Sequence, residues 1–169
     1  FFSVIIPTYN RCNELKVALN SVFEQTESSF EVIVIDDHST DGTIEWLNTI
    51  DDPRLSILIN KKTKGACGAR NTGVEAANSA WVAFLDSDDR WHKNKLEVVK
   101  NAILKHPEYA IFYSGCSYLL HDTLWYPPDR LNKNGDIRSF LGRKNRIGGA
   151  SVLLVQNNLL KRIGGFDET

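Results

Sequence analysis

Val32-Ile33-Val34-Ile35-Asp36-Asp37 is the stretch that decides the fold class of this 169-residue chain. Four β-branched residues in a row, with no polar residue between them, are typical of a parallel strand buried on both faces. The run ends in two carboxylates, where the strand is expected to leave the sheet. Since parallel strands are joined by long crossovers, helices are expected on either side of this run.

Strand and helix patterns do alternate from the first residue to about residue 113. Helices are indicated by apolar residues at i, i+3 and i+4, as in Leu15, Ala18 and Leu19. We therefore predict a doubly wound α/β fold, with three layers and a mainly parallel central sheet. The predicted order is strand 3–7, helix 15–23, strand 32–35, helix 44–50, strand 55–59, helix 68–78, strand 81–85, helix 96–103 and strand 110–113.

Two of these helices carry more specific signals. Ser39-Thr40-Asp41-Gly42 offers N-cap side chains to the helix that follows it. In the helix at 68–78, one face is made of small residues, which let a helix pack closely against a sheet. These residues are Ala69, Gly73, Ala76 and Ala77.

The bulk composition suits one globular domain, because 42% of the residues are hydrophobic and 24% are charged. From 119 to 150 the regular pattern decays, before an apolar run at 152–155 and a short helix near 157–163. The chain contains no Met and stops at Thr169 with no helix end in sight. We therefore expect 1–169 to be a single domain that is incomplete at its C-terminus.

Several classes of protein are disfavoured by charge and cysteine content. The net charge is −1 and the basic residues are dispersed, so no nucleic-acid partner is expected. Cys12, Cys67 and Cys116 are odd in number and far apart, which suits neither a disulfide framework nor a zinc site and favours a cytoplasmic location. No apolar run approaches the roughly 18 residues of a membrane span. Any association with a membrane is expected to come from partners or from segments outside this sequence.

Polar side chains follow three of the predicted strands. Pro7-Thr8-Tyr9-Asn10-Arg11 follows the first, Asp36-Asp37 the second, and Asp86-Ser87-Asp88-Asp89 the strand at 81–85. Ligands of open α/β sheets bind outside the carboxyl ends of the strands, so these three groups are expected to converge on one site.

The acidic cluster at 86–89 indicates a divalent metal. Three aspartates within four residues repel one another unless a cation or a positive partner is near. Mg²⁺ or Mn²⁺ suits a cluster without His or Cys, because such ions take one or two carboxylates and complete their shells with water and phosphate. A solvated acidic turn that caps the next helix is the alternative.

Two further groups are ambiguous by themselves. Lys64-Gly65-Ala66-Cys67-Gly68-Ala69-Arg70-Asn71 combines cations, glycines and a helix N-terminus, which suits a diphosphate. The glycines are equally explained as loop residues, and Arg70 as a surface ion-pair partner. Tyr9 is either a platform for a base or an ordinary packing residue.

Four motifs in order closely resemble family 2 glycosyltransferases. They are Ser-Val-Ile-Ile-Pro-Thr-Tyr-Asn at 3–10, Val-Ile-Asp-Asp-His-Ser-Thr-Asp-Gly-Thr at 34–43, Gly-Ala-Arg-Asn-Thr-Gly at 68–73 and Phe-Leu-Asp-Ser-Asp-Asp at 84–89. Ile-Gly-Gly-Phe-Asp-Glu at 163–168 also resembles the family's segment before the acceptor site. The resemblance implies a GT-A fold, with 1–113 as the nucleotide-binding part and 114–169 as the start of the acceptor-binding part.

The resemblance also implies an activity and roles for single residues. The activity is metal-dependent transfer of a sugar from a nucleotide donor, expected to be UDP-linked, to an acceptor hydroxyl with inversion. Pro7, Thr8, Tyr9 and Arg11 would line the nucleotide pocket, Asp37 would accept from the base, Arg70 would border it, and Lys64 would approach the phosphates. Asp86 would face the ribose. Asp88 would be the principal protein ligand of Mn²⁺ or Mg²⁺, with Asp89 nearby, and the sequence leaves open which of the two binds more directly.

Two departures from the family pattern matter. His38 stands where a small residue is common, and it either alters the pocket edge or points outward. The family's acidic motif with the catalytic base would lie beyond Thr169, so Asp167 and Glu168 are only weak candidates for that base. Two loop segments are candidates for contact with the acceptor. Trp125-Tyr126-Pro127-Pro128 offers an aromatic platform or forms a hydrophobic loop cluster. Gly148-Gly149-Ala150-Ser151 lines the acceptor cleft or forms a tight turn.

Three other functions compete with this interpretation. A GT-A-like module that only binds nucleotide, or an inactive fragment, would share the same motifs. A dinucleotide-dependent oxidoreductase would need Gly-x-Gly-x-x-Gly after the first strand, where the chain has Pro7-Thr8-Tyr9-Asn10. A sugar nucleotidylyltransferase would also need a glycine-rich loop there.

Overall fold

A mixed six-stranded sheet forms the centre of the molecule. The structure is a computed structural model, and it describes residues 1–120, 123–125 and 148–169. The six strands are β1 (Phe2–Thr8), β2 (Phe30–Asp36), β3 (Leu55–Ile59), β4 (Trp81–Phe84), β5 (Ile111–Tyr113) and β8 (Leu153–Gln156). Their order is β3-β2-β1-β4-β8-β5, and only β8 runs antiparallel to its neighbours. The prediction of a mainly parallel α/β sheet is confirmed.

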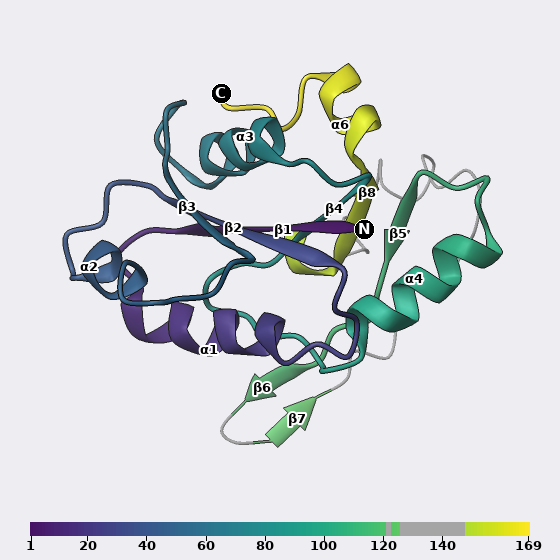
Figure 1. Cartoon of the computed structure of the whole chain (residues 1–169), viewed down its shortest axis with the longest axis horizontal. Coiled ribbons are helices and arrows are strands. Elements are labelled where there is room, and N and C mark those ends of the chain that lie inside the picture. Colours follow the sequence, from purple (N-terminus) through teal and green to yellow (C-terminus); the bar gives the residue numbers. More distant parts are fainter. Residues whose placement is uncertain (121–122, 126–147) are drawn as a thin grey trace.

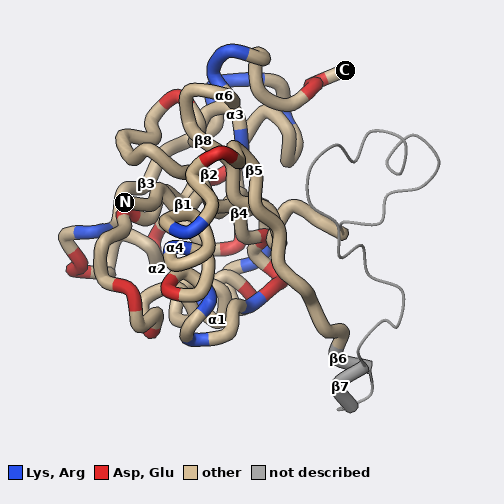
Figure 2. The backbone as a smooth tube through the Cα atoms, turned by 90° about the vertical axis from the view of Figure 1, so that its right-hand side faces the viewer, with Lys and Arg blue, Asp and Glu red and all other residues tan. Residues whose placement is uncertain are grey.

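Helices cover both faces of this sheet, which gives three layers (Figure 1). The described helices are α1 (Cys12–Phe23), α2 (Thr43–Leu47), α3 (Ala66–Ala76), α4 (Lys95–Lys105), α6 (Asn157–Ile163) and the 3₁₀ turn η1 (Ala150–Val152). In Figure 1, α3 and α6 lie on one side of the sheet and α1 and α4 on the other. Figure 2 shows the same separation after a 90° turn, with Lys and Arg interspersed among Asp and Glu along the described trace.

The burial of the central strands explains their sequence. Every residue of β1 is buried, and β2 is buried except at Glu31, because each has a strand on both sides and a helical layer on both faces. The small face of α3 fits the same picture. A Cβ added at Gly73 would lie 2.6 Å from Ile5 Cγ2, so only glycine allows the helix to approach the sheet this closely.

Some sequence predictions were wrong in detail. The helix predicted at 44–50 ends at Leu47, and its cap residue is Gly42 at φ 86°, so no side chain of the cap residue bonds to the helix. Asp41, one of the residues predicted to cap this helix, accepts from the Thr43 N–H at 3.2 Å, so a capping side chain from this stretch is confirmed. The chain also forms a two-stranded sheet of β6 (Tyr118–Leu120) and β7 (Thr123–Trp125), which the decayed pattern did not indicate.

Strand register brings three loop starts to the same sheet edge. Thr8 is paired with Asp36, and Ile5 with Phe84. The pairing extends one residue further on each side, since Asp37 N donates to Thr8 O at 2.8 Å and Leu85 N to Ile5 O at 3.0 Å. The residues after β1, β2 and β4 therefore leave the sheet side by side. Within the described residues, no helix has the length and apolar character of a bilayer span.

Candidate functional site

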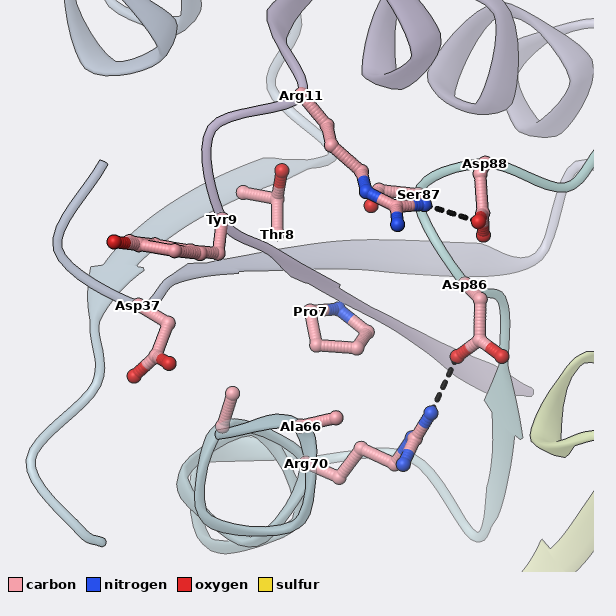
Figure 3. A pocket seen from close by; sticks show the side chains of 11 residues that line it. Pro7, Thr8, Tyr9, Arg11, Asp37, Ala66, Arg70, Asp86, Ser87 and Asp88 are labelled. Carbon is pink, nitrogen blue, oxygen red and sulfur yellow. Dashed lines mark hydrogen bonds and ion pairs between the residues drawn. The ribbon is translucent and has the colours of Figure 1, made fainter. Parts of the chain in front are cut away.

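A pocket of about 330 Å³ opens where β1, β2 and β4 end (Figure 3). Its wall combines polar and charged side chains from three loops with the first turns of α3. The lining residues are Pro7, Thr8, Tyr9, Arg11, Asp37, Ala66, Ala69, Arg70, Asp86, Ser87 and Asp88. Eight of the ten residues predicted for the site are therefore brought together, and Lys64 and Asp89 are not part of this wall.

Asp37 forms the end of the pocket beside β2 and is held rigidly. It is only 5% exposed. Its Oδ1 accepts from Asn60 Nδ2 at 2.6 Å, and its Oδ2 accepts from the Gly65 N–H at 2.8 Å. Asn60 is itself oriented by Thr72, whose hydroxyl donates to Asn60 Oδ1 at 2.8 Å. A buried carboxylate with fixed donors presents its remaining lone pairs in set directions, as a hydrogen-bonding recognition site requires.

The loops after β1 and β2 are tied together at the rim of the pocket. Asn10, at φ 49°, accepts from Thr40 N at 2.7 Å through its side chain and donates from its backbone N–H to Ser39 Oγ at 2.9 Å. His38 is exposed, has φ 67° and does not line the pocket. His38, the first departure from the family pattern, therefore points outward and does not form part of the pocket edge.

Two arginines balance two of the clustered carboxylates. Arg70 Nη2 lies 2.5 Å from Asp86 Oδ1, and Arg11 Nη1 pairs with Asp88 Oδ2, as Figure 3 shows. The Arg70 pair is partly buried, with side-chain exposures of 13% and 28%, whereas both members of the Arg11 pair are about half exposed. The repulsion expected within the cluster is thus relieved by positive partners from α3 and the β1 loop.

The third aspartate of the cluster points elsewhere. Asp89 Oδ2 accepts from the Ser151 hydroxyl at 2.6 Å and is not part of the pocket wall. Within the described residues, no three His, Cys, Asp or Glu side chains converge as metal ligands. Asp86 and Asp88 nevertheless face the same pocket, and one or two carboxylates are the usual protein share of a Mg²⁺ site that also uses phosphate. These residues fit such an ion if Arg11 releases Asp88.

Lys64 lies beside the pocket rather than in its wall. Its Nζ is 4.4 Å from the centre of the Tyr9 ring and 3.4 Å from the Tyr9 hydroxyl. Tyr9 is 45% exposed, so its ring is not a core residue. Tyr9 therefore does not pack in the core, and Lys64 lies over its ring as a cation–π partner. A role of Tyr9 as a platform for a base stays a prediction.

Asp167 and Glu168 lie outside the pocket wall. Glu168 accepts from Asn71 Nδ2 at 2.7 Å and from Thr63 N at 3.1 Å, and these bonds lower the pKa of its carboxyl. Hydrogen bonds from Thr169 likewise lower the pKa of Asp167. Because a general base works best with a pKa near the working pH, this geometry favours neither residue as the base.

Ala66, Ala69 and Ser87 line the pocket and lie in the stretches at 64–71 and 86–89 that the sequence associates with the site. Ser151 was a candidate for the acceptor side, whereas the structure bonds it to the Asp86 N–H and to Asp89. The functional residue that sequence reasoning missed is Asn60, which orients Asp37 from outside the pocket wall. Asn60 directly follows β3, so the rule that strand ends carry function could have indicated it. Tyr126 to Pro128 of the proposed aromatic platform lie outside the described residues.

The family is shown by the comparisons with known proteins. Residues 3–162 match the family model of glycosyl transferase family 2, so the chain belongs to that family. A glucosyltransferase of Escherichia coli, UDP-Glc:alpha-D-GlcNAc-diphosphoundecaprenol beta-1,3-glucosyltransferase WfgD, is 41% identical over 104 residues, which are 62% of this chain and 41% of that protein. The putative teichuronic acid biosynthesis glycosyltransferase TuaG of Bacillus subtilis is 37% identical over 122 residues, covering 71% and 48%. The chain thus spans less than half of either relative.

Solved structures agree on the fold. TarS of S. aureus, residues 1–349 in complex with UDP-GlcNAc, superposes with a TM-score of 0.74 at 25% identity, covering 98% of this chain and 48% of that one. The mannosyltransferase PcManGT of Pyrobaculum calidifontis superposes with a TM-score of 0.70 at 23% identity, covering 99% and 47%, a likeness of fold alone. The α/β fold is therefore of the GT-A type.

Proposed function

We propose that this chain is the donor-binding part of a glycosyltransferase that moves a sugar from a UDP-sugar to an acceptor hydroxyl, with inversion, in polysaccharide or glycoconjugate synthesis. The observation that carries the proposal is the pocket at the strand ends, which joins the fixed carboxylate of Asp37 to the charged pairs at Asp86 and Asp88. TarS, which shares the fold at 25% identity, was solved with UDP-GlcNAc. A cytoplasmic location stays a prediction.

The two ends of the pocket suit the two ends of a nucleoside diphosphate. Asp37 would accept from the N–H of the base, and the exposed face of Tyr9 would stack near it. Asp86 would receive the ribose hydroxyls, with Arg70 keeping its carboxylate in place. Arg11 would exchange its contact with Asp88 for the negative diphosphate, because both side chains are about half exposed and such an ion pair contributes little to stability.

Asp88 is our choice for the direct ligand of Mn²⁺ or Mg²⁺. It lines the pocket, whereas the Asp89 carboxylate is turned to Ser151. When bound, the ion would supply positive charge to the leaving diphosphate. Holding the ion requires the acidic turn to keep one position and requires Arg11 to move away. No described carboxylate of the pocket is spare for deprotonating the acceptor, so we expect the base outside this group.

Calorimetric titration with UDP tests the proposal, with and without Mn²⁺. We expect UDP to bind, more tightly with Mn²⁺, and UDP-sugars to be hydrolysed slowly to UDP. Binding without turnover of any donor would instead support the nucleotide-binding module, and a failure to bind UDP in either condition would contradict the proposal. Asp52→Ala is a suitable control variant, because Asp52 pairs with Arg54 outside the pocket.

A further inference from the structure

Ser151 lies directly behind the acidic turn and bonds to both of its ends. The Asp86 N–H donates to Ser151 Oγ at 2.9 Å, and the Ser151 hydroxyl donates to Asp89 Oδ2 at 2.6 Å. The turn is closed by a bond from Asp89 N to Asp86 O at 3.0 Å. Ser151 itself is only 8% exposed. One hydroxyl thus fixes the residues on both sides of Ser87 and Asp88.

The main chain of Ser151 is held just as firmly. Its carbonyl accepts from Trp91 Nε1 at 3.0 Å and from Lys95 Nζ at 2.9 Å. The Lys95 ammonium also donates to Ser114 Oγ at 2.9 Å and lies 4.9 Å from the centre of the Trp91 ring. Two side chains, Trp91 and Lys95, therefore bond η1 directly, and Lys95 links it to Ser114, the residue after β5. The position of Ser151 is set by packing that does not involve the pocket.

Among the residues that the structure describes, no partner other than Arg11 bonds to the Asp88 side chain. Its carboxylate is half exposed and contacts Arg11, which is itself half exposed. Its position must come from the backbone of the turn, and the ends of that turn are fixed by Ser151. Partners behind a metal ligand orient it and contribute to affinity for the ion.

We propose that Ser151 is a positioning residue, which holds the 86–89 turn so that Asp88 presents its carboxylate to a divalent cation, and that Asp89 acts through Ser151 rather than as a ligand. This inference rests on the proposed function, because it concerns the same cation. It also links the segment at 148–151 to the donor site through a defined pair of hydrogen bonds.

The test compares Ser151→Ala with Ser3→Ala in this chain. Ser3 is a matched control at the opposite end of β1, because its buried hydroxyl also donates to a carboxylate, Glu31, at 2.6 Å and accepts a backbone N–H, from Ser79, at 3.0 Å. Both variants lose the same kinds of bond and should lose similar stability. Only Ser151→Ala should weaken Mn²⁺ binding in the presence of UDP, by about tenfold, measured by electron paramagnetic resonance.

Two further variants separate positioning from stability. Ser151→Thr keeps the hydroxyl and should recover most of the Mn²⁺ affinity. Asp89→Ala, at an exposed position, should still bind Mn²⁺, with a smaller loss of affinity than Ser151→Ala. Because the two residues share one hydrogen bond, the double variant should lose less Mn²⁺ affinity than the sum of the two single losses.

Each outcome bears on the inference separately from the proposed function. If the unchanged chain binds UDP and Mn²⁺, equal Mn²⁺ affinities of Ser151→Ala and Ser3→Ala overturn the positioning role. Complete loss of Mn²⁺ binding in Asp89→Ala overturns it too, since Asp89 would then be a ligand. If the unchanged chain binds neither UDP nor Mn²⁺, the proposed function fails and this inference fails with it.

Discussion

Asp37 and Asp88 are carboxylates at two ends of one pocket, and the protein holds them in opposite ways. Asp37 is 5% exposed and accepts from Asn60 and Gly65. The Asp88 side chain is 50% exposed and forms an ion pair with Arg11, which is 47% exposed. A buried acceptor with fixed donors is suited to selecting one hydrogen-bonding edge. An exposed ion pair is suited to exchange, because it contributes little to stability. The difference suggests recognition at β2 and cation binding after β4.

The largest loss of stability is expected from replacing Asp37, the rigidly held carboxylate of the pocket. Asp37→Ala leaves the Gly65 N–H without its acceptor and removes one of the two acceptors of the buried Asn60 amide, which keeps Thr63 O. A lost bond to a buried polar group costs about 1–3 kcal/mol. We expect the free energy of unfolding to fall by about 2–4 kcal/mol in urea titrations and UDP affinity to be lost. A loss below about 1 kcal/mol would show that Asp37 is not the rigid member of the pair.

The buried ammonium of Lys95, which bonds to Ser151 behind the 86–89 turn, makes stability depend on pH. Burial lowers the pKa of Lys95 to about 8, although the nearby Cys116 and Asp89 act to raise it. Between about pH 8 and the ordinary value of 10.5, the unfolded chain therefore binds more protons than the folded one, so stability should rise with pH in this window. The rise is at most about 3 kcal/mol.

Lys95→Met should remove this rise, measured as the difference from the unchanged chain in urea titrations at pH 7.5 and 10. Lys105→Met, at an exposed position on the same helix, should keep it. Identical pH profiles for the unchanged chain and Lys95→Met would contradict the buried ammonium.

A substitution at Gly68 tests the rigid support of Asp37, because it displaces the loop that holds this carboxylate. A Cβ at this position would lie 1.9 Å from Thr63 O, so Gly68→Ala must displace the loop that carries Asn60 and Gly65. We expect a loss of about 1–3 kcal/mol in stability and a weaker affinity for UDP without metal. Cys67→Ala, one residue earlier in α3, is the control. Unchanged UDP affinity in Gly68→Ala would show that the position of the loop that carries Asn60 and Gly65 does not affect UDP binding.

The smallest effect on stability is expected from breaking the half-exposed ion pair of Asp88 and Arg11. Asp88→Ala and Arg11→Ala each break one half-exposed ion pair, which is worth less than about 1 kcal/mol. Thermal unfolding should therefore hardly distinguish these variants from the unchanged chain. A large loss in either variant would mean that this pair is structural, and the contrast with Asp37 would collapse.

Strand ends could be predicted from sequence because a parallel sheet makes them converge. The β-branched run at 32–35 and the polar residues after three strands were sufficient to indicate the pocket wall, including Tyr9 and Asp86. Small residues on α3 likewise predicted close packing of this helix against the sheet, and the contacts at Gly73 confirm it. These signals are local and follow from the geometry of the sheet.

Long-range partners could not be predicted in the same way. Nothing near Ser151 in the sequence indicates that its hydroxyl meets Asp86 and Asp89. Ser151 is 65 residues from Asp86 along the chain, and the two meet because β8 pairs with β4 in the sheet. The division of the three aspartates among Arg70, Arg11 and Ser151 depends on such contacts. The sequence indicates charge repulsion among the three aspartates, but it does not indicate which side chains relieve it.

The most direct measurement is a calorimetric titration of UDP into Asp88→Ala and Asp89→Ala, each with and without Mn²⁺. The account predicts that Asp88→Ala retains weak, metal-independent UDP binding but gains nothing from Mn²⁺, while Asp89→Ala still binds more tightly when Mn²⁺ is present. An unchanged Mn²⁺ effect in Asp88→Ala would contradict the assignment of the cation to the acidic turn.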